Sequence, residues 1–200
     1  MSMTIIGVTG GIGAGKSSVS FILHELGAKV IDADQLSREV VEPGKPAWHQ
    51  IVTSFGIEVL QPDKSLNRKL LAQKVFHSEA LRLKLEAIIH AQVIQCMKED
   101  LSAFKDQGYE GIVVLDVPIP VEHGFLDTVD QVWVVSAREE TRIQRVMARS
   151  GLTYDEAKSR IDAQLKQEEY QKLAHRIIEN DGTLEELKGT VEEMVKGLSG

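Results

Sequence analysis

Gly10-Gly11-Ile12-Gly13-Ala14-Gly15-Lys16-Ser17 stands between a β-branched run at residues 4–9 and a segment of helical apolar period at residues 17–26. The stretch has the form G-x-x-x-x-G-K-S/T, which makes a phosphate-binding loop when it follows a strand and precedes a helix. Its glycines let backbone N–H groups turn toward an anion, and the helix N-terminus adds positive partial charge. Lys16 is placed to reach the terminal phosphates of ATP, and the Ser17 hydroxyl is placed to ligate Mg²⁺. The loop residues expected to bind ATP are Gly11, Ile12, Gly13, Ala14, Gly15, Lys16, Ser17 and Ser18.

Three other classes of nucleotide-binding protein are disfavoured by the residues around this loop. The dinucleotide form G-x-G-x-x-G needs a third glycine, but counting from Gly11 puts Lys16 at that place. The chain has no Asn-Lys-x-Asp segment, which a regulatory GTPase would need to read its base. An ATPase that activates water usually has a Glu beside its strand-end Asp, whereas Asp116 is followed by Val117 and Pro118. We therefore expect a second substrate, rather than water, to accept the phosphoryl group.

Short apolar runs alternate with helical segments along the rest of the chain. The runs at residues 28–31, 112–115 and 131–135, with a marginal one at 176–178, are too short for helices and continuous enough for strands covered on both faces. They predict an α/β protein with the P-loop NTPase fold, in which helices flank a five-stranded parallel sheet. Helix starts are predicted by S/T-x-x-E capping boxes at Ser136 to Glu139, Thr153 to Glu156 and Thr183 to Glu186.

Acidic residues follow two of the predicted strands, at the sheet edge where ligands bind in parallel sheets. Asp32 and Asp34 follow the second strand, and either carboxylate can cap the next helix while the other accepts a proton from an attacking hydroxyl. The residues alone do not choose between the two. Asp116, after the third strand, is a candidate outer-sphere partner of Mg²⁺, and its alternative role is to cap the loop at Pro118.

A cluster of arginines follows the fourth predicted strand. Arg142, Arg145 and Arg149 recur at spacings of three and four and so share one helical face. Guanidinium groups on a mobile lid commonly stabilise the charge of a phosphoryl group in transfer. The alternative is a solvated face paired with Glu139 and Glu140.

The segment at residues 45–106 is helical in period, and a long amphipathic helix fits its apolar stripe best. We expect a single domain with a core at residues 1–44, 107–137 and 171–200, a helical acceptor subdomain at 45–106 and a lid region at 138–170. Cys96 lies beside the stripe and is expected to be a small buried apolar residue rather than a reactive thiol. The stripe consists of Leu81, Leu85, Ile88, Ile89, Val93, Met97, Leu101 and Phe104.

Composition limits the partners and the compartment. The 200 residues carry a net charge of −7, with 23 Lys plus Arg against 30 Asp plus Glu, so we expect neither nucleic-acid nor membrane binding. With one cysteine, no secretory signal pattern and no apolar run near the length of a membrane span, the protein is predicted to be cytoplasmic.

The sequence resembles the dephospho-coenzyme A kinase family over nearly its whole length. The residues that carry the resemblance are the phosphate loop with Thr9, residues 30–34 (Val-Ile-Asp-Ala-Asp) with Arg38, residues 41–44 (Val-Glu-Pro-Gly), 66–68 (Leu-Asn-Arg) with Val75-Phe76, 116–118 (Asp-Val-Pro), 144–149 (Gln-Arg-Val-Met-Ala-Arg), Ala163-Gln164 and 178–182 (Ile-Glu-Asn-Asp-Gly). Two departures fall near the acceptor: His90 is followed by Ala91 where the family has His-Pro, and residues 118–122 read Pro-Ile-Pro-Val-Glu where it has Pro-Leu-Leu-x-Glu.

The resemblance implies phosphorylation of the ribose 3'-hydroxyl of dephospho-coenzyme A by Mg-ATP, the last step of coenzyme A synthesis, in a monomer or small homo-oligomer. It implies that Asp34 is the catalytic base, that Arg145 and Arg149 are lid arginines and that Asn180 lies in the adenine-side loop. A nucleoside or nucleotide kinase of the same fold is the nearest alternative, and a non-catalytic nucleotide-binding protein is the alternative from another class. The residues expected on the acceptor side are Thr9, Asp34, Arg38, Arg68, His90 and Asp116.

Overall fold

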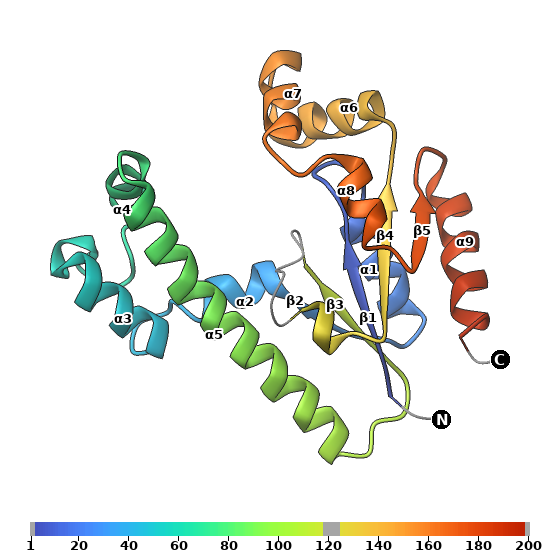
Figure 1. Cartoon of the computed structure of the whole chain (residues 1–200), viewed down its shortest axis with the longest axis horizontal. Coiled ribbons are helices and arrows are strands. Elements are labelled where there is room, and N and C mark those ends of the chain that lie inside the picture. Colours follow the sequence, from blue (N-terminus) through green and yellow to red (C-terminus); the bar gives the residue numbers. More distant parts are fainter. Residues whose placement is uncertain (1–2, 118–124, 199–200) are drawn as a thin grey trace. The chain divides into compact units, whose positions relative to one another are not determined.

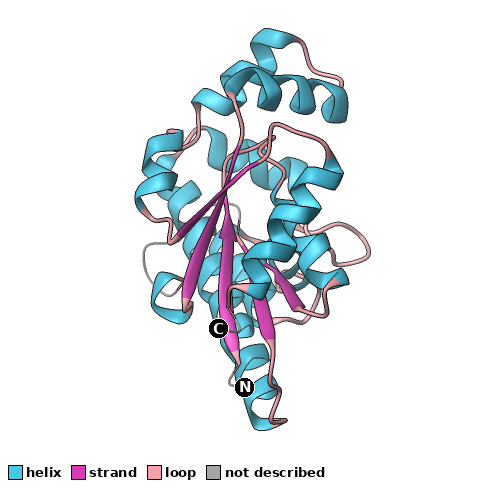
Figure 2. Cartoon of the chain, turned by 90° about the vertical axis from the view of Figure 1, so that its right-hand side faces the viewer, coloured by secondary structure: helices cyan, strands magenta, loops and turns pink. Residues whose placement is uncertain are grey.

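A computed structural model describes residues 3–117 and 125–198, and within these ranges it has one parallel sheet (Figures 1 and 2). The strands run in the order β2-β3-β1-β4-β5, and every neighbouring pair is parallel, which confirms the predicted five-stranded sheet. The predicted turn at Pro118 lies outside the described residues. The strands are β1 (Thr4–Thr9), β2 (Lys29–Asp32), β3 (Ile112–Asp116), β4 (Gln131–Ser136) and β5 (Arg176–Glu179).

The chain divides into two compact units. The first unit, residues 1–32 and 105–200, holds the sheet, and the second, residues 33–104, is helical. Helices of the first unit are α1 (Lys16–Glu25), η2 (Leu126–Thr128), α6 (Glu139–Ser150), α7 (Tyr154–Asp162), α8 (Gln167–Lys172) and α9 (Leu184–Lys196). Those of the second are α2 (Ala33–Glu39), α3 (Pro46–Phe55), η1 (Ile57–Val59), α4 (Arg68–Phe76) and most of α5 (Glu79–Asp106).

The core of the first unit follows from the alternation of side chains along β4. Trp133 and Val135 are fully buried in the cluster that α1 and α9 form with one face of the sheet. Val132 and Val134 point to the other face, where they pack with Tyr170 of α8. Because both faces are covered, the strands are continuously apolar, as the short Val-rich runs predicted.

The parallel strands bring the predicted site segments to one edge of the sheet. β1 lies in the middle and ends at Thr9, directly before the phosphate loop. The register pairs Val8 with Asp116, and Asp116 with Asp32 on its other side. The loop and the two strand-end carboxylates therefore belong to the same carboxyl edge.

The second unit is broken into several helices rather than one continuous helical block. α3 buries Ala47, Ile51 and Phe55, and the Trp48 indole N–H donates to the Lys64 carbonyl at 2.8 Å. The predicted long helix is α5, but only Val93, Met97 and Leu101 of its apolar stripe are buried. No helix in the described ranges has the length and apolar character to cross a membrane.

One predicted helix start is wrong. The boxes at Thr153 and Thr183 are formed, with the hydroxyl and the glutamate each accepting from the backbone of the other end. Ser136, however, is the last residue of β4, and α6 begins only at Glu139 with Arg138 as its N-cap. The Asp181 carboxylate, from the turn after β5, instead accepts from the Arg138 N–H at 3.0 Å.

Candidate active site

Two glycines of the phosphate loop have a backbone conformation that other residues rarely adopt. Gly13 has φ 79°, and Gly15, the N-cap of α1, has φ 99°. A Cβ at Gly13 would lie 2.6 Å from the carbonyl oxygen of Arg142, and one at Gly15 would meet the Asn180 side chain. The loop is thus packed between α6 and the turn after β5, and a substitution at either glycine meets both strain and overlap.

Lys16 is held at the carboxyl edge by Asp116. The Lys16 Nζ lies 3.0 Å from Asp116 Oδ1, and the Ser20 hydroxyl donates to Oδ2 at 2.6 Å. Asp116 is buried, and both side chains of the ion pair are largely shielded from water. Because little water reaches the pair, the attraction between the two charges is screened only weakly. This attraction holds the Lys16 ammonium group beside the loop.

Two side chains from the predicted lid region hold the Ile12 peptide. The Ile12 N–H donates to Gln164 Oε1 at 2.7 Å, and the Ile12 carbonyl accepts from Arg142 Nε at 3.0 Å. Arg142 is therefore buried against the loop, contrary to the alternative of a solvated face paired with Glu139 and Glu140.

Arg145 and Asn180 bind the next part of the loop. Arg145 Nη1 donates to the carbonyls of Gly13 and Ala14, each at 3.3 Å, and Asn180 Nδ2 donates to the Ala14 carbonyl at 2.8 Å. Asn180 is itself buried, with its N–H bound to the Ser136 carbonyl at 2.8 Å. Helix α6, which carries Arg142 and Arg145, and the polar turn after β5 thus both hold the phosphate loop in place.

Asp181 fixes the start of the arginine helix. Its carboxylate accepts from the Thr141 hydroxyl at 2.6 Å and pairs with Arg138 Nε at 3.3 Å. The hydrogen bond from Thr141, followed by those from Arg138, holds the pKa of Asp181 below its ordinary value of 3.8. A residue of the turn after β5 therefore sets the position of α6, and with it Arg142 and Arg145.

Other predicted site residues of the first unit differ in their exposure. Ser17 is exposed in the first turn of α1, where an oxygen ligand can be reached from solvent. Thr9 is fully buried, and its hydroxyl has no hydrogen-bond partner among residues 3–117 and 125–198. Arg149 is exposed in the last turn of α6. Asp32, the last residue of β2, is exposed as well.

In the second unit, Asp34 lies in the first turn of α2 and is exposed. Arg38, in the last turn of the same helix, lines an open groove of about 430 Å³ together with Arg68. His90 is exposed on α5 and is not among the residues that line this groove. The lining residues are Arg38, Val41, Glu42, Pro43, Gln61, Ser65, Leu66, Asn67, Arg68 and Lys69.

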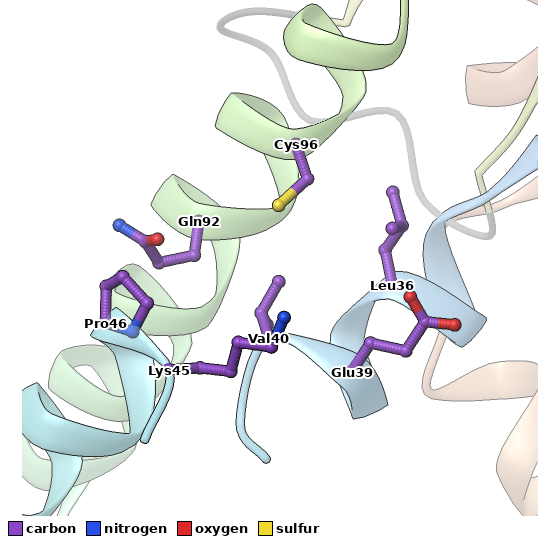
Figure 3. A pocket seen from close by; sticks show the side chains of 7 residues that line it. All are labelled: Leu36, Glu39, Val40, Lys45, Pro46, Gln92 and Cys96. Atoms are coloured by element: carbon purple, nitrogen blue, oxygen red, sulfur yellow. The ribbon is translucent and has the colours of Figure 1, made fainter. Parts of the chain in front are cut away.

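A second, smaller cavity contains Cys96 (Figure 3). It measures about 80 Å³, and apolar side chains such as Leu36 and Val40 line it. Burial, with the Glu99 and Asp100 carboxylates adding to it, raises the pKa of the Cys96 thiol. Cys96 is half-buried rather than buried as predicted, and its raised pKa disfavours the reactive thiolate.

Sequence reasoning missed the contacts of Ser20 and Gln164. Ser20 had a usable signal, because it lies four residues after Lys16 and so on the same face of α1. Gln164 entered only through the resemblance, and no local pattern connects it to Ile12.

A family profile described as dephospho-CoA kinase matches residues 4–186. The chain belongs to the dephospho-CoA kinase family. It is 44% identical to the dephospho-CoA kinase of Geobacter sulfurreducens over 192 residues, which cover 96% of this chain and 97% of that one. It is 45% identical to the dephospho-CoA kinase of Shouchella clausii over 180 residues, covering 90% and 91% of the two chains.

Solved structures agree with this membership. TT1252 from Thermus thermophilus superposes with a TM-score of 0.80 at 33% identity and full coverage of both chains. The dephospho-CoA kinase from Campylobacter jejuni gives 0.72 at 25% identity, covering 98% of each chain. Shikimate kinase from Bacteroides thetaiotaomicron, at 15% identity and a TM-score of 0.55 over 98% and 99% of the chains, shows the shared P-loop kinase fold alone.

Proposed function

We propose that this kinase transfers the terminal phosphoryl group of ATP to the ribose 3'-hydroxyl of dephospho-coenzyme A, giving coenzyme A and ADP. The observation that carries the proposal is the family match across residues 4–186, in a chain whose phosphate loop has Lys16 paired with Asp116. In the reaction the acceptor oxygen bonds to the γ-phosphorus, the bond to the β–γ bridging oxygen breaks, and the hydroxyl proton goes to a base.

The nucleotide side of the site is assigned to the first unit. The backbone N–H groups of residues 11–18 surround the phosphates, Lys16 neutralises the terminal oxygens, and Asn180 supports the loop from the adenine side. Arg145 and Arg149 stabilise the charge that spreads over the transferred group. Arg145 Nη1 lies 3.3 Å from two loop carbonyls, so its guanidinium is beside the loop that would hold the phosphates.

The residues present also fit a magnesium ion. Mg²⁺ prefers oxygen ligands and is usually held by few protein groups together with substrate phosphates. Ser17 offers an exposed hydroxyl at the start of α1, and Asp116 offers a carboxylate beside Lys16. When bound with ATP, the ion neutralises phosphate charge in the transfer.

The acceptor residues that the resemblance implies are Asp34, Arg38, Arg68 and His90 in the second unit, and Thr9 and Asp116 in the first. Asp34 is the proton acceptor in this assignment, and its side chain is exposed in the first turn of α2. The groove that Arg38, Arg68 and Lys69 line suits the diphosphate of dephospho-coenzyme A, because guanidinium and ammonium groups pair with phosphate oxygens. His90 is a further acceptor contact in this assignment.

An acceptor panel tests the function. ADP release from Mg-ATP is measured with dephospho-coenzyme A, with nucleosides, with nucleoside monophosphates and with no acceptor, using Lys16→Ala as the blank. We expect stimulation by dephospho-coenzyme A and phosphorus at the 3'-position of the product. Stimulation only by nucleosides or their monophosphates would make the protein a different kinase, and ATP binding without turnover on any acceptor would make it a non-catalytic binder. We further propose that the enzyme acts in the cytoplasm as a monomer or small homo-oligomer, without nucleic-acid or membrane partners.

A further inference from the structure

Arg142 lies at the end of the first turn of α6 and is 6% exposed. Its Nε donates to the Ile12 carbonyl at 3.0 Å, so one edge of the guanidinium is fixed on the phosphate loop. Its Nη2 is fully buried and has no hydrogen-bond partner among the residues that the structure describes. This nitrogen lies against Gly11, where a Cβ would overlap it.

The environment of Arg142 makes this unsatisfied N–H costly. Within the described ranges no carboxylate lies within ion-pair distance of its guanidinium. Burial lowers the pKa of the Arg142 guanidinium, so its charged form is less favourable in this place than in water. A buried cation with an unused donor gains free energy when an anion reaches it.

The neighbouring cations Lys16 and Arg145, unlike Arg142 Nη2, have hydrogen-bond acceptors. Lys16 is paired with Asp116, and Arg145 is bound to two loop carbonyls. Arg142 is therefore a cation that is fixed at the edge of the phosphate loop. It has one N–H donor without an acceptor among the described residues.

We propose that Arg142 is a phosphate-binding residue, whose Nε anchors the Ile12 peptide while Nη2 donates to a phosphate oxygen of the bound nucleotide. The proposal rests on the proposed function only in taking the anion to be the phosphate chain of a nucleotide. Gln164 holds the Ile12 N–H at 2.7 Å independently of Arg142, so the loop keeps one of its two side-chain anchors when Arg142 is changed.

The test compares Arg142→Gln with the matched control Arg160→Gln. Glutamine can still donate to the Ile12 carbonyl but removes the charge and the second donor, whereas Arg160 is an exposed arginine on α7 of the same region. Isothermal titration with inorganic pyrophosphate and with ADP should show dissociation constants raised about tenfold to a hundredfold in Arg142→Gln, the usual loss for a charged hydrogen bond. Arg160→Gln should bind like the wild type.

A second readout separates binding from a merely structural role. Because Arg142 is an uncompensated buried charge without ligand, the ligand-free melting temperature of Arg142→Gln should equal or exceed that of the wild type, and the increment on adding pyrophosphate should shrink. A lower ligand-free melting temperature with unchanged pyrophosphate and ADP affinity would overturn the proposal.

A crystal structure of the wild-type protein with pyrophosphate decides the case even if the variant does not fold. Arg142 Nη2 within about 3.2 Å of a phosphate oxygen supports the proposal, and a longer separation overturns it. None of these three experiments uses an acceptor. Failure of dephospho-coenzyme A to stimulate turnover would therefore refute the proposed function while leaving Arg142 to be judged on its own result.

Discussion

At the scale of single residues, Asp32 and Asp34 form a natural internal comparison. They are two positions apart, both are exposed, and only one of them is assigned as the base. Asp34→Asn keeps the size of the side chain but removes the proton-accepting charge. We expect single-turnover transfer to fall about a hundredfold to ten-thousandfold, with ATP affinity nearly unchanged.

Asp32→Asn is the matched control and should cost much less. Quench-flow measurement at saturating ATP and dephospho-coenzyme A compares the two variants directly. If Asp32→Asn cripples transfer while Asp34→Asn stays near the wild type, the base has been assigned to the wrong carboxylate.

Lys16 gives a second prediction at this scale. Lys16→Ala should reduce the rate of phosphoryl transfer more than about a hundredfold. The loss of one preorganised electrostatic contact to the transition state typically has an effect of this size. The side chain belongs to a loop rather than to the apolar core, and Ser20 still donates to Asp116, so the far-UV circular dichroism spectrum should remain that of the wild type. An unfolded spectrum would show that Lys16 has a structural role instead.

The residues of the site differ in how far local sequence could predict them. Lys16 and Ser17 follow from the loop motif, because the motif itself specifies their place at the start of a helix. The spacing of Arg142 and Arg145 correctly predicts a shared helical face, but it says nothing of what the face contacts. The contact between Arg142 and Ile12 joins residues that are 130 positions apart in the sequence. It depends on tertiary packing, which no local pattern encodes.

At the scale of elements, capping chemistry distinguishes α9 from α6. Thr183 caps α9 with its hydroxyl, and Glu186 completes the box. Thr183→Ala should therefore lower the free energy of unfolding by about 1 kcal/mol, measured by urea denaturation.

The control is Glu139→Ala, at the glutamate of the box that does not form. The Glu139 carboxylate contacts Lys158 on the surface at 2.8 Å, so its removal should leave the denaturation midpoint nearly unchanged. A loss at Glu139 equal to that at Thr183 would mean that the Ser136 box stabilises α6 after all.

The failed box shows why element boundaries are harder to predict than elements. The strands and α5 follow from apolar runs and periodicity, which are properties of one segment. The start of α6 depends on Asp181, a residue 43 positions from Arg138, and that long-range carboxylate takes the place of the local serine.

At the scale of the whole molecule, stability should depend on pH in the acid range. Hydrogen bonds from Thr141 and Arg138 lower the pKa of Asp181 below 3.8, and hydrogen bonds from Thr153 and Thr183 lower those of Glu156 and Glu186 below 4.5. A carboxyl group whose folded pKa is lowered contributes stability above its unfolded pKa, and this contribution is lost as the pH falls through the folded pKa. We expect the free energy of unfolding to fall from about pH 5 downward.

Asp181→Asn tests one part of this expectation. The amide keeps an acceptor for Thr141 but does not titrate, so urea denaturation at several pH values should show a shallower acid loss than in the wild type. An equal slope would show that Asp181 does not contribute.

The chain has two tryptophans, and each unit contains one. Trp133 is fully buried in the sheet core, so its fluorescence should be blue-shifted in the native state and move to the red when the sheet unfolds. Trp48 lies on α3 of the helical unit. Emission from Trp48→Phe therefore follows the sheet alone, and the difference from the wild type follows the helices. The molecule thus has a pair of intrinsic optical probes, with which one denaturant titration can show whether the sheet unit and the helical unit unfold in one cooperative step or in two.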